Sequence, residues 1–226
     1  MLAHRVMMGV ASGDPYWGNV VALLHFDGAD ASTTFTDVKG HTFTASGDAQ
    51  IDTAQSKFGG ASGLFDGTGD YVTSDSSADF GFGSGDYTIE GWARQGNVSG
   101  DRLLIDTRIG GQGVGLYSST STSARKLVLA NNTAVIATSS NTIPIDSWVH
   151  VALTRASGTV KGFLGGAQEF SVTDSRTLAA STQIRFGANN GAGQLYIGHL
   201  DEWRITKGVA RYTSSFTPPP APFQNY

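Results

Sequence analysis

Short β-like stretches recur along almost the whole chain, and they restrict the fold more than any other feature of the sequence. Gly, Asp, Asn and Ser separate them, and no helical pattern lasts longer than about two turns. Gly accounts for 30 of 226 residues, against a typical ~7%. The expected strands are 20–26, 42–45, 49–51, 63–65, 71–74, 87–94, 102–107, 114–118, 126–130, 133–138, 148–155, 159–164, 168–172, 183–187 and 195–206.

Many short strands without alternating helices bury their apolar faces most simply in two packed sheets. The sequence therefore predicts an all-β fold, a two-sheet antiparallel β-sandwich of the jelly-roll type. We expect an N-terminal arm at 1–19, the sandwich at 20–216 and an extended Pro-rich C-terminal tail at 217–226. A single helical turn is expected at 207–213.

Charge and composition exclude several classes of function. The net charge of −4 and the pI of about 5.6 argue against a nucleic-acid partner, which would require a basic surface. No apolar run reaches the ~18 residues of a membrane span. The chain has no cysteine, so disulfides, thiolate metal sites and a cysteine nucleophile are excluded.

Five segments carry a family pattern. They are Leu24–Gly28 (LHFDG), Lys57–Gly67 (KFGGASGLFDG), Asp86–Arg94 (DYTIEGWAR), Trp148–Arg155 (WVHVALTR) and Gly198–Ile205 (GHLDEWRI). In this order they resemble the concanavalin A-like lectin/glucanase superfamily, in its laminin G-like jelly-roll branch. The resemblance covers roughly residues 20–216. It implies a lectin-like sandwich that binds carbohydrate or protein ligands, although a fold does not by itself fix a function.

Glycoside hydrolysis is the enzymatic activity that this resemblance asks us to consider. A glycosidase needs two positioned carboxylates, and the glucanase branch carries them in a Glu-x-Asp-x-Glu pattern on one strand. This chain has only three glutamates, Glu90, Glu169 and Glu202, which lie far apart in the sequence. We therefore expect no enzymatic activity. A glycan hydrolase with a split pair such as Glu90 and Asp201 is the least favoured alternative.

Two aspartates are candidates for a structural Ca²⁺ site. Asp27 follows the first strand, and Asp201 lies in the last, and in laminin G-like relatives the chain ends meet near such residues. Ca²⁺ takes six to eight oxygen ligands, mostly from carboxylates and carbonyls. The loop Asp66–Asp70 is an alternative acidic site, although Asp and Gly are also favoured there simply as turn residues.

A carbohydrate site requires an aromatic platform beside planar polar groups. Tyr117 precedes a Ser/Thr-rich loop and is expected to be exposed, and Arg108 and Asn131 are candidates for the polar contacts. Trp148 and Trp203 lie in the recurring strands of the family and are expected in the core. These residues define the second hypothesis, a carbohydrate-binding module that recognises cell-surface glycans.

The N-terminal arm carries apolar residues outside the expected sandwich. These residues, Val6, Met7, Met8, Tyr16 and Trp17, are candidates for assembly. Exposed apolar residues in such number usually dock onto a surface. That surface is either the sandwich of the same chain or a partner, namely a second copy in a homo-oligomer (a trimer by analogy with virus particles) or another virion protein.

The leader Met1–Gly9 (MLAHRVMMG) and the single-domain layout also resemble virion proteins of tailed bacteriophages. The leading hypothesis is therefore a non-enzymatic structural protein of a phage virion, either a capsid decoration or a component of a tail adhesin. Its expected location is the virion, on the capsid surface or the tail, and otherwise the extracellular space. As an adhesin, it would contact a glycan of the host surface.

Overall fold

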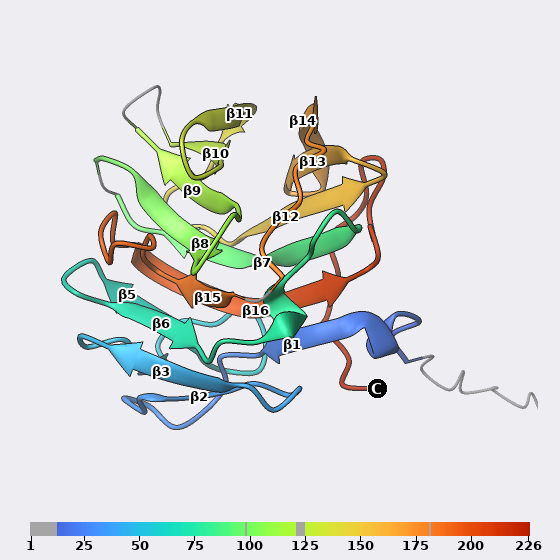
Figure 1. Cartoon of the computed structure of the whole chain (residues 1–226). Helices are drawn as coiled ribbons and strands as arrows, with labels where there is room; N and C mark the ends of the chain where they lie inside the picture. The colour runs from blue at the N-terminus through green and yellow to red at the C-terminus, as the bar shows by residue number, and fades with distance from the viewer. Residues whose placement is uncertain (1–12, 98, 121–124, 181) are drawn as a thin grey trace, which may run out of the picture.

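Two antiparallel β-sheets pack face to face in the computed structural model of the protein (Figure 1). The structure describes residues 13–97, 99–120, 125–180 and 182–226. Helix within these ranges is confined to two 3₁₀ turns, Trp17–Asn19 (η1) and Ala78–Phe80 (η2), so none of it is long or apolar enough to cross a membrane. The all-β sandwich predicted from the sequence is confirmed.

One sheet, called sheet A, has the strand order β14-β13-β12-β7-β16-β5-β4, with β1 also paired to β16. Strand β16 contacts β7 on one side and both β5 and β1 on the other, so the first and last strands of the chain lie side by side. The strands of sheet A are β1 (Val20–Leu24), β4 (Gln50–Asp52), β5 (Ser62–Asp66), β7 (Tyr87–Gln95), β12 (Val149–Ala156), β13 (Thr159–Leu164), β14 (Ala167–Thr173) and β16 (Ile197–Lys207).

The second sheet, called sheet B, has the order β11-β10-β9-β8-β15-β6-β3-β2. Its neighbours pair in antiparallel register throughout. The strands of sheet B are β2 (Thr34–Thr36), β3 (Thr42–Ser46), β6 (Tyr71–Ser74), β8 (Arg102–Ile109), β9 (Gly115–Ser119), β10 (Lys126–Ala130), β11 (Val135–Thr142) and β15 (Gln183–Phe186).

The core lies between the two sheets and follows the period of two expected of half-buried strands. Ile89 and Leu153 of sheet A and Leu116 and Phe186 of sheet B all point into it. Trp203 is fully buried among them, and its indole nitrogen donates to the carbonyl oxygen of Trp92 at 3.1 Å. The prediction that Trp203 lies in the core is therefore confirmed.

Trp148 lies elsewhere than expected. Its side chain is half-buried, and its ring lies 6.5 Å from the ring of His199, whose neighbour Leu200 points into the core. Since alternate residues of a strand point to opposite faces, Trp148 lies on the outer face of sheet A, the face turned away from the core. The prediction that Trp148 is a core residue is wrong.

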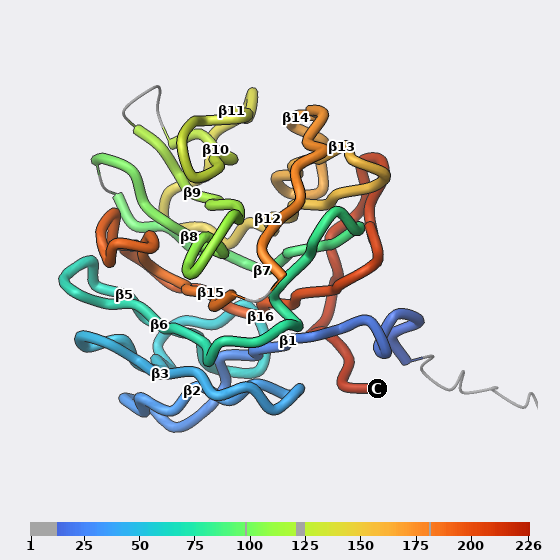
Figure 2. Tube along the Cα trace, in the orientation of Figure 1, coloured from blue at the N-terminus to red at the C-terminus, as the bar shows by residue number. Residues whose placement is uncertain are grey.

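The last nineteen residues run across the outer face of sheet A. Thr154 donates to the carbonyl oxygen of Tyr212 at 2.9 Å, and the rings of Tyr212 and Phe216 stack with centroids 3.5 Å apart. Further along, the buried Phe223 packs against Val20 and other residues of β1. Figure 2 shows this red segment ending beside the blue N-terminal part of the chain. The 217–226 tail is therefore packed against the sandwich.

The single helical turn expected at 207–213 does not form. The backbone there is held open against β7, because Thr88 donates to the carbonyl oxygen of Val209 at 2.9 Å and accepts from the amide of Arg211 at 2.9 Å. These side-chain bonds replace the backbone bonds that a helical turn would make. The helical expectation was wrong because the local sequence gave no sign of this tertiary contact.

Residues 13–19, at the end of the expected arm, pack on the sandwich of their own chain. Trp17 contacts the cluster of Val20, Leu23 and Phe223, and the ammonium of Lys39 lies 4.3 Å from the centre of its ring. Tyr16 remains 42% exposed. Trp17 thus packs on the sandwich of its own chain, as the first of the two alternatives predicts. The other assembly candidates, Val6, Met7 and Met8, lie outside the described residues.

Candidate functional site

A row of polar side chains crosses the outer face of sheet B. The backbone register places each of its members directly opposite the next on the neighbouring strand. All belong to the face opposite the core, because their chain neighbours Phe35, Phe43, Val72, Ile105 and Phe186 are core residues. The polar row consists of Thr34, Thr44, Thr73, Arg185 and Asp106.

The row continues into a preformed ion pair. Asp106 is fully buried, and its carboxylate accepts from Arg108 Nε at 2.8 Å and Nη2 at 2.6 Å. The same guanidinium donates through Nη1 to the carbonyl oxygen of Asn131 at 3.0 Å. It lies over Gly115, where a Cβ atom would be 2.6 Å from Nη2. The absence of a side chain at Gly115 therefore makes room for the pair.

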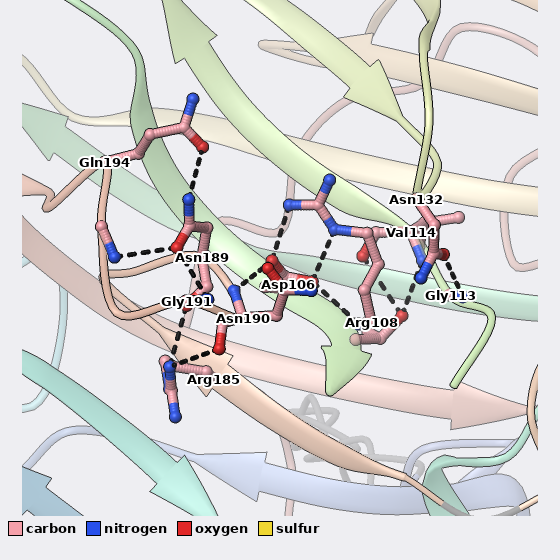
Figure 3. A network of polar contacts seen from close by, with 12 residues as sticks. Asp106, Arg108, Gly113, Val114, Asn132, Arg185, Asn189, Asn190, Gly191 and Gln194 are labelled. Carbon is pink, nitrogen blue, oxygen red and sulfur yellow. Dashed lines mark hydrogen bonds and ion pairs between the residues drawn. The ribbon is translucent and has the colours of Figure 1, made fainter. Parts of the chain in front are cut away.

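The loop between β15 and β16 adds exposed planar amides to this face (Figure 3). The backbone amide of Asn190 donates to the carboxylate of Asp106 at 2.9 Å, which fixes the loop to β8. The side-chain oxygen of Asn189 accepts from Gly191 and Gly193, and its nitrogen donates to Gln194 at 3.1 Å. The polar groups are thus held in place by one another before any ligand arrives.

Arg185 links this loop to the threonines of the row. Its Nε donates to Thr73 Oγ1 at 2.8 Å, and its Nη1 donates to the carbonyl oxygens of Asn189 at 2.8 Å and Asn190 at 3.4 Å. The guanidinium lies over the ring of Tyr71, with 4.3 Å from Cζ to the ring centre. These contacts fix the plane of the guanidinium, whereas exposed arginines are ordinarily free to rotate.

A groove of about 460 Å³ opens at the end of the row where β2 and β3 lie. Thr44 lines it and is exposed, and its partner across the ladder is Thr73. Thr73 is in turn the register partner of Arg185, so Arg185 lies two strands away from the groove. Its lining residues are Thr33, Thr34, Phe43, Thr44, Ala45 and Gly47.

The structure brings the three predicted carbohydrate-binding residues to one face but changes their roles. Tyr117 is only 8% exposed and packs with Leu103 and Val128, so the prediction of an exposed platform is wrong. Asn131 Oδ1 accepts from the amides of Thr133 at 2.8 Å and Ala134 at 2.7 Å. Its side chain therefore closes the turn after β10, and its carbonyl oxygen positions Arg108.

Sequence reasoning missed the threonines and Arg185. The signal was present in Thr-Phe-Thr at 34–36 and at 42–44, and in Tyr-Val-Thr at 71–73. In each, polar residues flank one apolar residue, which is the alternation of a strand with one face open to solvent. The alignment of these threonines with Arg185 depends on strand order, which spans more than a hundred residues of sequence.

The predicted Ca²⁺ ligands approach the same loop, Lys57–Ala61. Asp201 is fully buried, and its Oδ2 accepts from the amides of Lys57 at 2.6 Å and Phe58 at 3.1 Å, whereas its Oδ1 has no hydrogen-bond partner among the described residues. The carboxylate of Asp27 lies against Gly59, where a Cβ atom would be 2.1 Å from Oδ1. The loop thus joins the two aspartates.

Burial and neighbouring carboxylates disfavour the charged forms of these two aspartates. Burial raises the pKa of Asp201 to about 7, although the hydrogen bonds from the backbone amides of Phe58 and Lys57 act to lower it. The charges of Glu202 and Asp27 raise this pKa further. Burial also raises the pKa of Asp27. No group of three or more His, Asp or Glu side chains converges within the described ranges, so a Ca²⁺ ion here would need backbone carbonyl oxygens as further ligands.

A second polar network lies under the C-terminal segment on sheet A. The fully buried Glu90 accepts from Arg204 Nε at 3.0 Å and Nη2 at 2.7 Å, and from the hydroxyl of Tyr212 at 2.7 Å. Asp14 joins Arg204 to Arg211, at 2.8 Å from each. Burial alone would raise the pKa of Glu90, but Arg204 above all, with contacts from His150 and Tyr212, lowers it to about 2.

All three glutamates are occupied by protein partners. Glu90 is held in the buried network, and Glu202 lies 2.6 Å from His25 Nδ1 and accepts from the amide of Phe223 at 2.8 Å. Glu169 accepts from the amides of Ser140 at 3.0 Å and Asn141 at 2.9 Å, which joins β14 to β11. Each glutamate thus connects two parts of the fold.

Comparisons with solved structures agree with this architecture. Domain 4 of AbnA, an extracellular arabinanase from Geobacillus stearothermophilus solved with arabinotriose, is 19% identical with a TM-score of 0.65, over 85% of this chain and 94% of the domain. A botulinum neurotoxin type C structure is 13% identical with a TM-score of 0.60, over 86% of this chain and 49% of that chain. At these identities the likeness shows the fold alone.

A sialidase of Trypanosoma rangeli is similar in the same way, 14% identical with a TM-score of 0.61, over 85% of this chain but only 31% of the sialidase. No curated protein sequence matches the chain. The sequence does match a family, Laminin_G_3, described as the concanavalin A-like lectin/glucanases superfamily, over residues 66–211. Since this match spans well over half of the sequence, the chain belongs to the concanavalin A-like lectin/glucanase superfamily.

Proposed function

We propose that the protein is a non-catalytic carbohydrate-binding module whose glycan lies across the outer face of sheet B. The observation that carries this proposal is the polar row, in which the exposed Thr34 and Thr44 beside a groove are followed in register by the half-buried Thr73, the fixed guanidinium of Arg185 and the Asp106–Arg108 pair. Sugars offer many hydroxyls, each able to donate and accept, and such a row presents partners of both kinds at fixed positions.

Two similar structures support the choice of ligand class. The arabinanase domain was solved with arabinotriose, and the neurotoxin structure is described in terms of an interaction with two ganglioside molecules. Both are therefore sandwiches of this fold that are associated with carbohydrate ligands. A non-catalytic role is supported by the glutamates, since each is held by protein partners and Glu90 is fully buried beneath other residues.

The test is direct binding of the full chain to a glycan array, followed by calorimetry with each saccharide that binds. We expect the double substitution Thr44→Val and Thr73→Val to weaken binding by at least about tenfold, because it removes two hydroxyls of the row. Thr173→Val is the matched control, an exposed strand threonine on sheet A. Equal binding by all three proteins would place the glycan elsewhere, and no binding at all would refute the proposal.

A structural Ca²⁺ ion between Asp27 and Asp201 is a second proposal. It is supported by the unpartnered, buried Oδ1 of Asp201 and by the close approach of Asp27 to Gly59. Asp27 and Asp201 would hold the ion, and its charge would offset the repulsion between them. We expect Ca²⁺ to raise the thermal midpoint of the wild type over that in EGTA, and to leave Asp201→Asn unchanged. The same midpoint in Ca²⁺ and EGTA would refute the site.

Membership of a phage virion is a further proposal, supported by the sequence of the leader. The module would then serve as a capsid decoration or an adhesin component, with a homo-oligomer, a trimer in particular, as its assembled form. Light scattering of the full chain beside a form lacking residues 1–12 tests the assembly. We expect a discrete oligomer for the full chain and a monomer for the shorter form. A monomer in both cases would remove the arm as an assembly element.

A further inference from the structure

We infer that the saccharide recognised by sheet B is anionic, and that Arg185 binds its carboxylate. This inference rests on the proposed glycan-binding function and names the ligand class of the same face. Its starting point is the state of the Arg185 guanidinium, in which two nitrogens are bound to protein and the third is not. Nε and Nη1 donate to Thr73 and to the carbonyl oxygens of Asn189 and Asn190.

Nη2 of Arg185 makes no hydrogen bond to any described residue, so its two N–H groups remain for a ligand. The side chain is only partly exposed, and the ring of Tyr71 supports it from one side at 4.3 Å. A guanidinium held in this way has already lost the rotational freedom that binding ordinarily costs. The free nitrogen is therefore a prepared donor.

The charge balance of the row also favours an anion. Asp106 is the register partner of Arg185, but its oxygens are bound by both Arg108 nitrogens and by the amide of Asn190. No carboxylate of the described residues lies within ion-pair distance of Arg185. At the Arg185 end of the row, the guanidinium groups of Arg185 and Arg108 thus face one buried aspartate, which leaves a net positive charge around Arg185.

The surroundings of Arg185 suit a carboxylate that is attached to a sugar. Thr73 accepts from Arg185 Nε, so its own hydroxyl hydrogen is directed elsewhere, and the exposed Thr44 lies opposite on β3. A carboxylate held by Nη2 would find threonine hydroxyls as further donors, and the ring hydroxyls of the sugar would continue along the row. A neutral saccharide would leave the positive charge without a partner.

The experiment uses pairs of ligands that differ in charge alone. The full chain is titrated with oligogalacturonate and its methyl ester, and with sialyllactose and the methyl ester of its sialic acid carboxylate. For at least one pair we expect the carboxylate to bind about ten- to a hundredfold more tightly, because hydrogen bonds to charged groups are the stronger ones. This preference should fall as salt is added, since a partly exposed ion pair is screened.

Variants then assign the preference to Arg185. Arg185→Gln should lower the affinity for the acidic ligand to the affinity for its neutral partner. Arg185→Lys should retain part of the preference for the acidic ligand. Arg94→Gln is the control, because it removes a partly exposed arginine from the outer face of sheet A. The thermal unfolding midpoint of each variant is compared with that of the wild type to check that the variant folds.

The outcomes separate this inference from the function on which it rests. Equal binding of acid and neutral forms, or a preference that Arg185→Gln leaves intact, overturns the inference while the glycan-binding function stands. Binding confined to a sulfated oligosaccharide probe overturns the assignment of a carboxylate. Failure to bind any saccharide refutes both the inference and the proposed function.

Discussion

The outer faces of both sheets carry the polar residues of alternating strands, but those at the centre of sheet A are covered by other parts of the chain, whereas several on sheet B are exposed. On sheet A, Glu90 and Arg204 lie beneath the C-terminal segment, and their charges are matched within the fold. On sheet B, Thr44 is exposed, and Arg185 Nη2 has no hydrogen-bond partner in the part of the chain that the structure describes. The difference comes from the described ends of the chain, residues 13–19 and 208–226, which pack on sheet A. A polar residue on a strand therefore indicates a binding function only once it is known whether another segment of the chain packs over it.

The largest effect should come from breaking the covered network on sheet A. Glu90→Gln leaves Arg204 buried with Asp14 as its only carboxylate partner, and removing one member of a buried ion pair typically costs about 3–5 kcal/mol. Urea unfolding monitored by tryptophan fluorescence measures the loss. Glu169→Gln is the control, since its contacts are largely exposed, and we expect it to cost about 1 kcal/mol or less. Similar losses for both would mean that the cover on sheet A adds nothing.

Acid should also weaken the network on sheet A. The folded-state pKa of Glu90 is lowered to about 2 from an ordinary value of 4.5. The resulting stability is complete above pH 4.5 and is lost as the pH falls towards 2, because protons then bind the unfolded chain more readily. Unfolding free energies measured between pH 6 and about pH 2.5 should fall more steeply for the wild type than for Glu90→Gln. Parallel curves would contradict the assignment.

A smaller effect is expected when the ion pair on sheet B is displaced. In Gly115→Ala the new Cβ atom would be 2.6 Å from Arg108 Nη2, so the guanidinium at the end of this flexible side chain would have to shift. We expect a loss of about 1 kcal/mol in unfolding free energy together with weaker glycan binding. Gly18→Ala is the control, because nothing lies within 4 Å of its Cβ position. A loss as large as that of Glu90→Gln would show that the two faces are equally constrained.

The same contrast explains what the sequence revealed. Local alternation was sufficient to predict the sandwich and every strand except β2 (Thr34–Thr36), and Lys126–Ala130 was predicted with its observed bounds. Tyr117 was misjudged, because its burial depends on Leu103 and Val128, which reach it from neighbouring strands. Arg185 was missed for a related reason, since its partners Thr73 and Asn190 meet only through the order of strands in sheet B.

The smallest effect on stability is expected at Thr44, and the sharpest comparison sets it beside Thr154, because the same substitution is then made on both faces. Thr154 on sheet A is 1% exposed and donates to the carbonyl oxygen of Tyr212 at 2.9 Å, whereas Thr44 on sheet B is exposed. Thr154→Val removes the hydroxyl donor from that carbonyl oxygen and should cost about 1–2 kcal/mol. Thr44→Val should change stability by less than about 0.5 kcal/mol while it weakens glycan binding.

Paired urea titrations and calorimetry on the two valine variants measure both quantities. Stability should fall in Thr154→Val alone, and glycan affinity should fall in Thr44→Val alone, because Thr154 lies under the C-terminal segment and Thr44 lines the groove. If Thr154→Val also lost affinity, the ligand would contact sheet A. If Thr44→Val lost stability to the same extent, the row on sheet B would serve the fold, and its exposure would have no bearing on a ligand.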